Sequence, residues 1–407
     1  MRMKRLLKSL AAGLALGVLP VASAYAKAFY DFTDPVTPVA KDTLYIHDLF
    51  LAIITIIFIV SLAFLLYSLI AHRRSKNPTP ATFTAPKTGF QWFLSALPIL
   101  IMIFIDYVVL GIPSVHAIMD LANNGNDQMV VVATASQWKW NYAYPKYGLK
   151  FNSVLSTPND EIYGNAPKDK HFLLEVDHPL VVPTNEKVGV VLKSRDVIHG
   201  FWVPAFGIKQ DVIPGFLRKT WFKIDKPGTY RGQCSELCGV GHSFMPIVVV
   251  AKTPAQFKIW LASEQAKESA AQAATGKTWS QADLVADGKK VFDKNCASCH
   301  QASGMGIPGV FPPIATGHPF SASKAMLEDL TERGFYKDGK IVEGPLENHI
   351  GIVLNGIPGT AMPAFKKQLS ATDIASVITF ERNAFGNHTG QSVQPAKIQQ
   401  ALSGAAK

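Results

Sequence analysis

The sequence predicts a multidomain protein: a two-helix transmembrane hairpin, then an all-β domain, then an all-α domain. Two long apolar runs lie near the beginning of the chain. Short runs rich in Val, Ile, Phe and Trp alternate with Pro and Gly in the middle, and short helical segments around loops follow. With 407 residues, the chain is long enough for two or three domains.

The first 26 residues have the pattern of a signal peptide. Basic residues precede a short apolar run from Leu10 to Val21, and small residues follow it up to Ala26. The run is too short to span a bilayer comfortably, which favours a cleaved signal peptide over residues 1–26 rather than an uncleaved membrane helix.

Two longer apolar runs, residues 48–71 and 90–113, each have the length of a membrane-spanning helix. Basic residues cluster between them, which marks this loop as cytoplasmic. We therefore expect a two-pass hairpin over residues 40–115, with everything after Pro113 on the periplasmic or outer side of a bacterial inner membrane. The basic residues of the loop are His72, Arg73, Arg74, Lys76 and Lys87.

The rest of the chain divides by composition. Residues 128–260 predict an antiparallel β-sandwich or barrel, and residues 261–281, rich in Ala, Ser, Gln and Glu, a solvated linker. Residues 282–386 predict the helical domain, and residues 387–407 a disordered tail. The expected strands include Met129–Ala133, Phe172–Val176, Val188–Leu192, Thr220–Ile224 and Ile247–Ala251.

The net charge of +10 does not by itself indicate nucleic acid, because no nucleic-acid-binding motif accompanies it. The four cysteines form two tight pairs far apart in sequence. Two disulfides would suit an exported protein, but each pair lies beside a histidine at a spacing typical of a metal or haem site. We therefore expect two redox sites and no nucleic-acid partner.

The first cysteine pair belongs to a dense set of metal-binding residue types. Cys234, Cys238, His242 and Met245 place two thiols, an imidazole and a thioether within twelve residues. Soft sulfur donors favour copper, whereas imidazole suits copper or zinc. Glycines and a proline predict a loop rather than a helix, which a distant histidine, His199, can join. From spacing alone, a structural zinc site or buried inert cysteines stay as alternatives.

The segment from Gly232 to Pro246, GQCSELCGVGHSFMP, resembles the binuclear copper motif of cytochrome c oxidase subunit II, and the resemblance covers residues 40–255. It implies a cupredoxin-like Greek-key sandwich holding a copper A centre of two copper ions. In this family two thiolates bridge the coppers, two histidines bind one copper each, and a methionine and a backbone carbonyl complete the set. Carried over, the ligands are His199, Cys234, Glu236 through its carbonyl, Cys238, His242 and Met245.

Two further roles follow from this resemblance. The side chain of Glu236 would contact a magnesium or manganese ion at the border with oxidase subunit I. In the aromatic segment 137–142, Trp138 would be the residue through which electrons enter the copper centre. From the sequence alone, these aromatic residues could equally form the core of a strand.

The second cysteine pair has the C-x-x-C-H spacing of covalent c-type haem attachment: Cys296-Ala-Ser-Cys299-His300. The two thiols add to the porphyrin, and His300 becomes one axial ligand. Residues 284–386 also resemble a bacterial class I cytochrome c domain, so we expect haem c as the second cofactor.

The other axial ligand should come from later in the chain, so that the polypeptide can wrap the haem. Met362 is the predicted ligand. Met305 lies too close to His300 to reach the opposite face, and Met326 has the pattern of a core methionine. Ligation by His and Met raises the potential of a haem and suits an electron relay.

Together the two resemblances imply subunit II of a caa3-type haem–copper oxidase. Electrons would pass from a donor, such as cytochrome c or a quinol–cytochrome c reductase, through haem c and copper A to subunit I, where oxygen is reduced to water with proton translocation. This chain would hold no oxygen-reducing site. The alternative is the copper A subunit of a nitric oxide reductase, which could use a similar domain. A copper delivery protein is a remote alternative, because the full ligand set and the haem motif do not suit an exchangeable copper site.

The second membrane helix departs from the family pattern. Where the family commonly has a glutamate at the mouth of a proton pathway, this chain has Gln91, and Asp106 lies deep in the same helix. Charge also bears on the donor: residues 129–260 carry sixteen Lys and Arg against ten Asp and Glu. A basic cytochrome c should be repelled from such a domain, so we predict that electrons enter through the haem domain.

Overall fold

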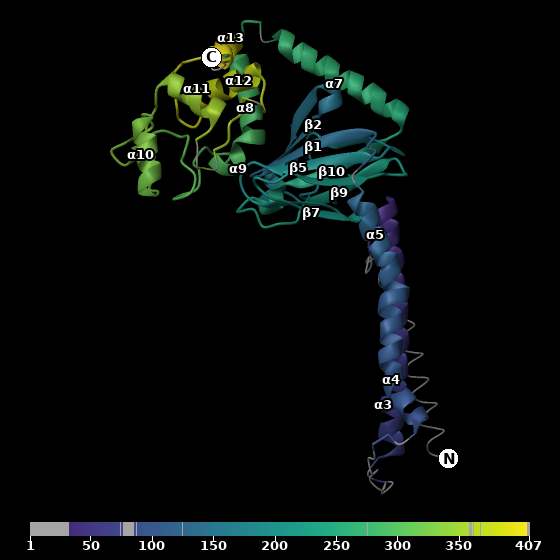
Figure 1. Ribbon diagram of the computed structural model, residues 1–407. Coiled ribbons are helices and arrows are strands. Elements are labelled where there is room, and N and C mark those ends of the chain that lie inside the picture. The colour runs from purple at the N-terminus through teal and green to yellow at the C-terminus, as the bar shows by residue number, and fades with distance from the viewer. Residues whose placement is uncertain are drawn as a thin grey trace.

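The computed structural model describes residues 32–73, 75, 85–86, 88–123, 125–274, 276–357, 360, 362–366 and 368–404. The predicted signal peptide and its cleavage site lie outside these residues, as do Arg74, Lys76 and Lys87 of the predicted cytoplasmic loop. Figure 1 shows a helical stalk, a β-sandwich at one end of the stalk and a helical domain beside the sandwich.

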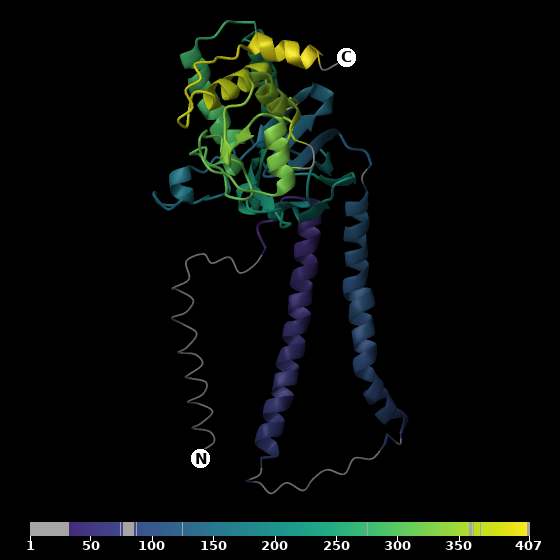
Figure 2. The same ribbon diagram turned by 90° about the vertical axis from the view of Figure 1, so that its left-hand side faces the viewer.

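The stalk contains two helical segments of 34 residues that are long and apolar enough to cross a membrane. One is α3, Pro38–Ala71. The other runs without a break through α4, Gly89–Ile103, a π-helix η2, Phe104–Gly111, and α5, Ile112–Ala122. Most of their large apolar side chains are exposed, and both segments meet the same side of the sandwich (Figure 2). This is the arrangement that the predicted hairpin requires.

The sandwich packs two five-stranded sheets face to face, in the orders β3-β2-β1-β5-β8 and β4-β10-β9-β6-β7. Large aromatic side chains, among them Trp140, Tyr142 and Phe201, are fully buried between the sheets. The strands are β1 Met129–Ser136, β2 Lys139–Tyr144, β3 Leu149–Ser153, β4 Leu180–Pro183, β5 Val188–Ser194, β6 His199–Val203, β7 Ile208–Val212, β8 Arg218–Phe222, β9 Gly228–Cys234 and β10 Pro246–Lys252; the short helix α6, Asn159–Ile162, lies between β3 and β4.

Two strand predictions were wrong in detail. Phe172–Val176 is not a strand, because turns occupy it and Leu173 takes a left-handed φ of 59° that interrupts extended backbone. β4, a few residues later, pairs with β10 instead. The sandwich is also not wholly antiparallel: β1 pairs with β5, and β4 with β10, in parallel. Long connections through other elements separate both pairs, as parallel pairing requires.

The helical domain surrounds two small apolar cores. Helices α8 and α12 pack closely, because Gly288 lies where a Cβ atom would be 2.1 Å from the Ser376 carbonyl oxygen. The elements are α8 Gln281–Asn295, α9 Ala297–His300, α10 Lys324–Glu332, the hairpin of β11 Tyr336–Lys337 and β12 Lys340–Ile341, α11 Leu346–Asn355 and α12 Ala371–Glu381.

The predicted linker and tail both contain regular structure. Most of residues 261–281 continues the helix α7, Pro254–Ala274, which crosses the sandwich (Figure 1); Ala, Gln and Glu are strong helix formers. The tail was expected to be disordered, but α13, Pro395–Gly404, closes the helical domain. Val393 and Ile398 are fully buried there, and this apolar burial is what orders the segment.

Hydrogen bonds hold the stalk against the sandwich. The Val36 amide donates to the Ala205 carbonyl at 3.2 Å, and the Thr37 hydroxyl donates to the Phe206 carbonyl at 2.8 Å, beside the start of α3. At the end of α5, the Trp221 indole donates to the Asp120 carbonyl at 3.0 Å. The sandwich is therefore tied to the ends of both membrane segments.

Candidate metal and haem sites

The loop between β9 and β10 gathers three sulfur atoms. Cys234 Sγ and Cys238 Sγ lie 3.8 Å apart, and Cys238 Sγ lies 3.5 Å from Met245 Sδ and 3.4 Å from His242 Nδ1. Cys234 is the last residue of β9, and Met245 directly precedes β10. The two paired strands therefore fix both ends of the loop, and all three sulfur-bearing residues are buried.

His199 reaches the same point from β6. It is fully buried, and its Nδ1 lies 3.9 Å from Cys234 Sγ. Its Nε2 lies 2.8 Å from Asp196 Oδ1. Because an ionised carboxylate only accepts, Nε2 carries the proton and Nδ1 keeps its lone pair for a metal ion. The sequence reasoning gave Asp196 no role, although a carboxylate three residues before a ligand histidine was the available signal.

Electrostatics in the loop favour a thiolate. A hydrogen bond from Cys238 holds the pKa of Cys234 well below its ordinary value and raises the pKa of Cys238 itself. Burial lowers the pKa of His199, but Asp196 and the Cys234 thiolate raise it by more. A bound cation would take over these favourable interactions and release the remaining protons.

The backbone carbonyl and the carboxylate of Glu236 face different surroundings. Its backbone carbonyl faces the sulfur pair, with the carbonyl oxygen 3.3 Å from Cys234 Sγ. Its carboxylate turns away and lies 3.5 Å from Lys209 Nζ. The full set of thiols, imidazoles, thioether and carbonyl fits copper, because a zinc site would leave Met245 without a role. In the described part of the chain, donor atoms of His199, Cys234 and Cys238 all lie within 4.8 Å of one another.

Trp138 joins the copper loop to the helical domain. Its indole nitrogen donates to the Cys238 carbonyl at 3.0 Å. Gly241 lets the loop lie on the indole, since a Cβ there would be 2.3 Å from Trp138 Cδ2. On its other side the ring packs edge-to-face on Phe311, with 6.2 Å between centroids. Trp138 is only 6% exposed, so the helical domain covers it.

A cavity of about 840 Å³ lies between the helical domain and the sandwich. Cys296, Cys299 and His300 line it on the helical side, and Trp138 and Lys139 line it on the sandwich side. Its walls are mostly apolar and its volume lies within the range of ligand pockets. A porphyrin attached at the two cysteines fits these walls.

The groups that would hold a haem are prepared for it. His300 Nδ1 donates to the Pro312 carbonyl at 2.9 Å, which leaves Nε2 free to bind iron. Burial lowers the pKa of His300 and so keeps the neutral imidazole that binds a metal. Met362 and Met326 both line the cavity, whereas Met305 is 42% exposed. The arrangement disfavours Met305 as an axial ligand of the haem. Substitution of Met362 and of Met326 can distinguish between the two remaining candidates.

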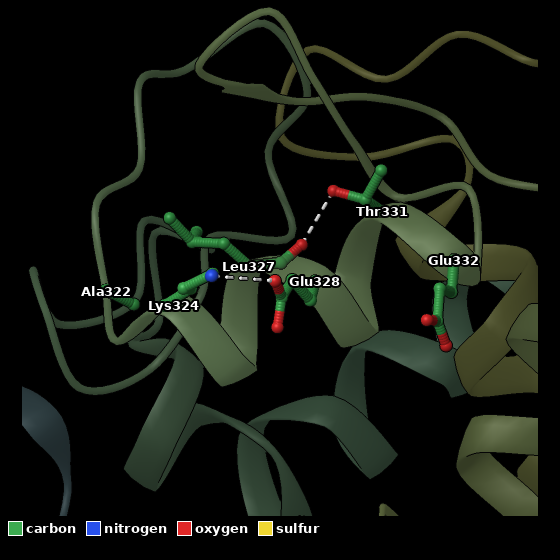
Figure 3. Close-up of a pocket in the computed structure, with 6 residues that line it drawn as sticks. All are labelled: Ala322, Lys324, Leu327, Glu328, Thr331 and Glu332. Carbon is green, nitrogen blue, oxygen red and sulfur yellow. Dashed lines mark hydrogen bonds and ion pairs between the residues drawn. The ribbon is translucent and has the colours of Figure 1, made fainter.

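A second, shallower hollow lies on α10 (Figure 3). Lys324 Nζ pairs with Glu328 Oε1 at 3.7 Å, and Thr331 Oγ1 donates to the Leu327 carbonyl at 2.6 Å. Lys324, Glu328 and Thr331 are thus engaged within the helix itself, and we assign no chemistry to the hollow.

Gln91 and Asp106 lie in the stalk, away from both sites. The Thr88 amide donates to Gln91 Oε1 at 3.2 Å and the Gln91 amide donates to Thr88 Oγ1 at 3.3 Å, so Gln91 belongs to a capping box at the start of α4. Asp106 lies in η2. At the position where the resemblance implies a glutamate, this chain therefore has a residue that helps to begin a helix.

Three family models match the chain. The transmembrane domain of cytochrome c oxidase subunit II matches residues 24–114, its periplasmic domain matches residues 129–252, and subunit III of the cbb3-type cytochrome c oxidase matches residues 283–380.

Two named relatives and one solved structure are similar to part of the chain. The chain is 33% identical over 234 residues to a probable cytochrome c oxidase subunit 2 of Rickettsia bellii, covering 57% of this chain and 83% of the relative, and 33% identical to that of Rickettsia felis, covering 57% and 71%. The solved periplasmic domain of subunit II of cytochrome oxidase of Bradyrhizobium japonicum is 40% identical, covering 35% of this chain and 96% of that one, with a TM-score of 0.32. The chain therefore belongs to the cytochrome c oxidase subunit 2 family, with a cytochrome c domain fused after its copper-binding oxidase domain.

Proposed function

We propose that this chain is subunit II of a caa3-type haem–copper oxidase in a bacterial inner membrane, with the sandwich and the cytochrome domain on the periplasmic side. It passes electrons from an external donor, such as cytochrome c, by way of haem c and copper A to subunit I, which reduces oxygen to water with proton translocation. The bound copper pair and haem supply the one-electron redox chemistry, and the residues of this chain hold, orient and connect them.

The copper ligands would be Cys234 and Cys238 as bridges, His199 and His242 with one copper each, and Met245 and the Glu236 carbonyl at the remaining positions. Burial of this set in the core of the sandwich would keep its geometry nearly constant in both redox states, which suits a relay. The carboxylate of Glu236 is the proposed contact for a magnesium or manganese ion at the border with subunit I.

The haem would be attached to Cys296 and Cys299, with His300 and Met362 as axial ligands. The neutral, oriented imidazole of His300 supports this assignment. Met362 is favoured over Met326 because a methionine near the end of the wrapping segment can reach the face opposite His300.

The observation that carries the proposed route is the burial of Trp138 between the two sites. Its indole donates to the Cys238 carbonyl at 3.0 Å and packs on Phe311 of the cytochrome domain. A soluble donor cannot contact a tryptophan that is 6% exposed. The distribution of charge also supports this route. Residues 282–386 carry ten Lys and Arg against eleven Asp and Glu, so the cytochrome domain repels a basic donor less than the sandwich does.

Removal of the cytochrome domain tests this route. The cut belongs after Ala274, because α7 extends to that residue and Trp260 packs on Tyr144 with 5.6 Å between centroids. In the assembled oxidase, the shortened chain should keep its copper absorption but oxidise a basic cytochrome c slower by on the order of tenfold or more.

A small artificial reductant that bypasses docking is the control, and its rate should be unchanged. Equal rates with basic cytochrome c for the shortened and intact chains, both falling as salt rises, would show that the haem domain is not the required point of electron uptake.

A further inference from the structure

Lys139 is a buried cation at the junction of the two redox domains. It begins β2, directly after Trp138, and is 4% exposed. Its Nζ lies 4.4 Å from the centroid of the Phe365 ring, which belongs to the cytochrome domain. It also lines the cavity that contains Cys296 and Cys299. The sandwich thus presents a positive charge to the haem cavity.

No carboxylate forms an ion pair with this charge in the described part of the chain. Its ammonium group lies over the Phe365 ring, and Cys296, Cys299, Arg195 and Asp196 act on it electrostatically. The nearby carboxylate of Asp196 is already engaged: it accepts from the Gln137 amide at 2.7 Å, from the Val197 amide at 2.8 Å and from His199 Nε2 at 2.8 Å. A buried ammonium without a carboxylate costs free energy. A leucine or methionine would fill the same space without that cost.

The ammonium group nevertheless carries its charge at neutral pH. Burial lowers the pKa of Lys139, but only to about 8. A cation–π contact of the observed length stabilises the charged form where a neutral side chain would gain less. The buried positive charge of Lys139, rather than the volume of its side chain, is therefore the feature that calls for a functional explanation.

A fixed positive charge has a defined effect on a haem. Oxidation adds one positive charge to the iron, so a cation held nearby in a poorly screened site disfavours the oxidised state. Anionic neighbours would have the opposite effect, and the acidic group near the copper loop, Asp196, is directed at His199 instead. Glu381, which also lines the cavity, is paired with His349 Nε2 at 2.8 Å.

We propose that Lys139 is a positioning residue for electron uptake: its ammonium group docks the sandwich on the cytochrome domain through Phe365 and raises the midpoint potential of the haem in the adjoining cavity. The higher potential makes the haem a better acceptor for the external donor. This inference rests on the proposed attachment of haem c at Cys296 and Cys299.

The test is a redox titration of the haem absorption band in the purified oxidase complex carrying Lys139→Met. We expect the equilibrium between reduced and oxidised haem to shift about tenfold toward the oxidised form, a fall of about 59 mV for one electron, with one haem still attached per chain. Lys139→Arg, which keeps the charge and the ring contact, should restore the wild-type potential. Lys146→Met is the matched control, because it removes an exposed lysine of the same domain.

If Lys139→Met disturbs folding, Lys139→Gln provides a second neutral variant. A wild-type potential in every neutral variant that retains haem would overturn the proposal, as would an equal fall in Lys146→Met. The outcome is separable from that of the proposed route: a shortened chain that still oxidises cytochrome c quickly would contradict the route while leaving the dependence of the haem potential on Lys139 intact.

Discussion

The proposed copper site and the proposed haem site adjoin each other, but the polypeptide builds them by different means. The proposed copper donors come from β6, the end of β9 and the loop that follows it. Each of their side chains lies within 4 Å of a neighbouring donor, and the three sulfur-bearing residues are part of the continuous core of the sandwich. The haem cavity lies between the two apolar clusters of the cytochrome domain and is completed by residues of the sandwich. The sandwich thus encloses the proposed copper site with its own core, whereas the proposed haem would fill the core of the cytochrome domain.

Loss of the haem attachment should therefore have the largest effect. In the double substitution Cys296→Ser and Cys299→Ser, the cytochrome domain would have to keep an empty cavity of about 840 Å³. At ~24 cal/mol per Å³, the cost exceeds the ~5–15 kcal/mol that stabilises a domain. Hydrogen exchange should show loss of protection in α12 and retained protection in β10. Continued protection of α12 without haem would remove the contrast between the domains.

Loss of one bridging thiol should affect only the sandwich. Cys238→Ser removes a sulfur that lies close to three other donors, so the absorption of the coupled copper pair should disappear while haem stays attached. Metal analysis and the visible spectrum of the purified complex give the result. The copper assignment is refuted if the wild-type protein, prepared with copper available, contains zinc alone.

Removal of the predicted axial methionine should have a smaller, local effect. Met362→Ala should leave the haem covalently attached, lower its potential and open a coordination position, so that the reduced protein binds carbon monoxide. Met326→Ala is the matched variant, since Met326 lines the same cavity. Carbon monoxide binding to Met326→Ala, with none to Met362→Ala, would reverse the ligand assignment.

The smallest effect should come from the ion pair that joins the domains. Asp177 Oδ2 lies 3.4 Å from Lys294 Nζ. Burial raises the pKa of Asp177, but hydrogen bonds from His178 and the Val154 amide, with the charge of Lys294, lower it by more. A depressed folded pKa gives stability that is present above the unfolded value, about 4, and is lost as pH falls through the folded value.

Asp177→Asn should consequently lower the thermal stability of the domain junction by about 1 kcal/mol or less at pH 7, with the difference from wild type narrowing below about pH 4. The stability difference is measured from thermal unfolding at a series of pH values, followed by the haem absorption band. Lys289→Met, which breaks the pair with Asp293 inside α8, is the control and should not share this pH dependence. A difference that stays constant down to pH 3 would mean that the pair does not hold the domains together.

Local chemistry was readable from the sequence. The two membrane segments follow from the length of their apolar runs, and the copper loop and the haem motif from the spacing of Cys, His and Met. These features depend on residues that are near neighbours in the chain. Segments whose state depends on distant contacts were predicted less well: Phe172–Val176 forms turns, and the expected disordered tail folds as α13 because Val393 and Ile398 find a core to enter.

The relation between the two sites was decided by the tertiary structure alone. Lys139 and Phe365 are in contact but lie more than two hundred residues apart in the chain. A periodic sequence pattern reveals few contacts between residues that far apart. The burial of Trp138 and the position of Lys139 on the wall of the haem cavity arise only when the cytochrome domain docks on the sandwich. Sequence spacing specifies which groups can bind a cofactor. The electrostatic field at those groups, and the residues that contact them, depend on burial between distant segments. Burial determines both the dielectric surroundings and the available partners.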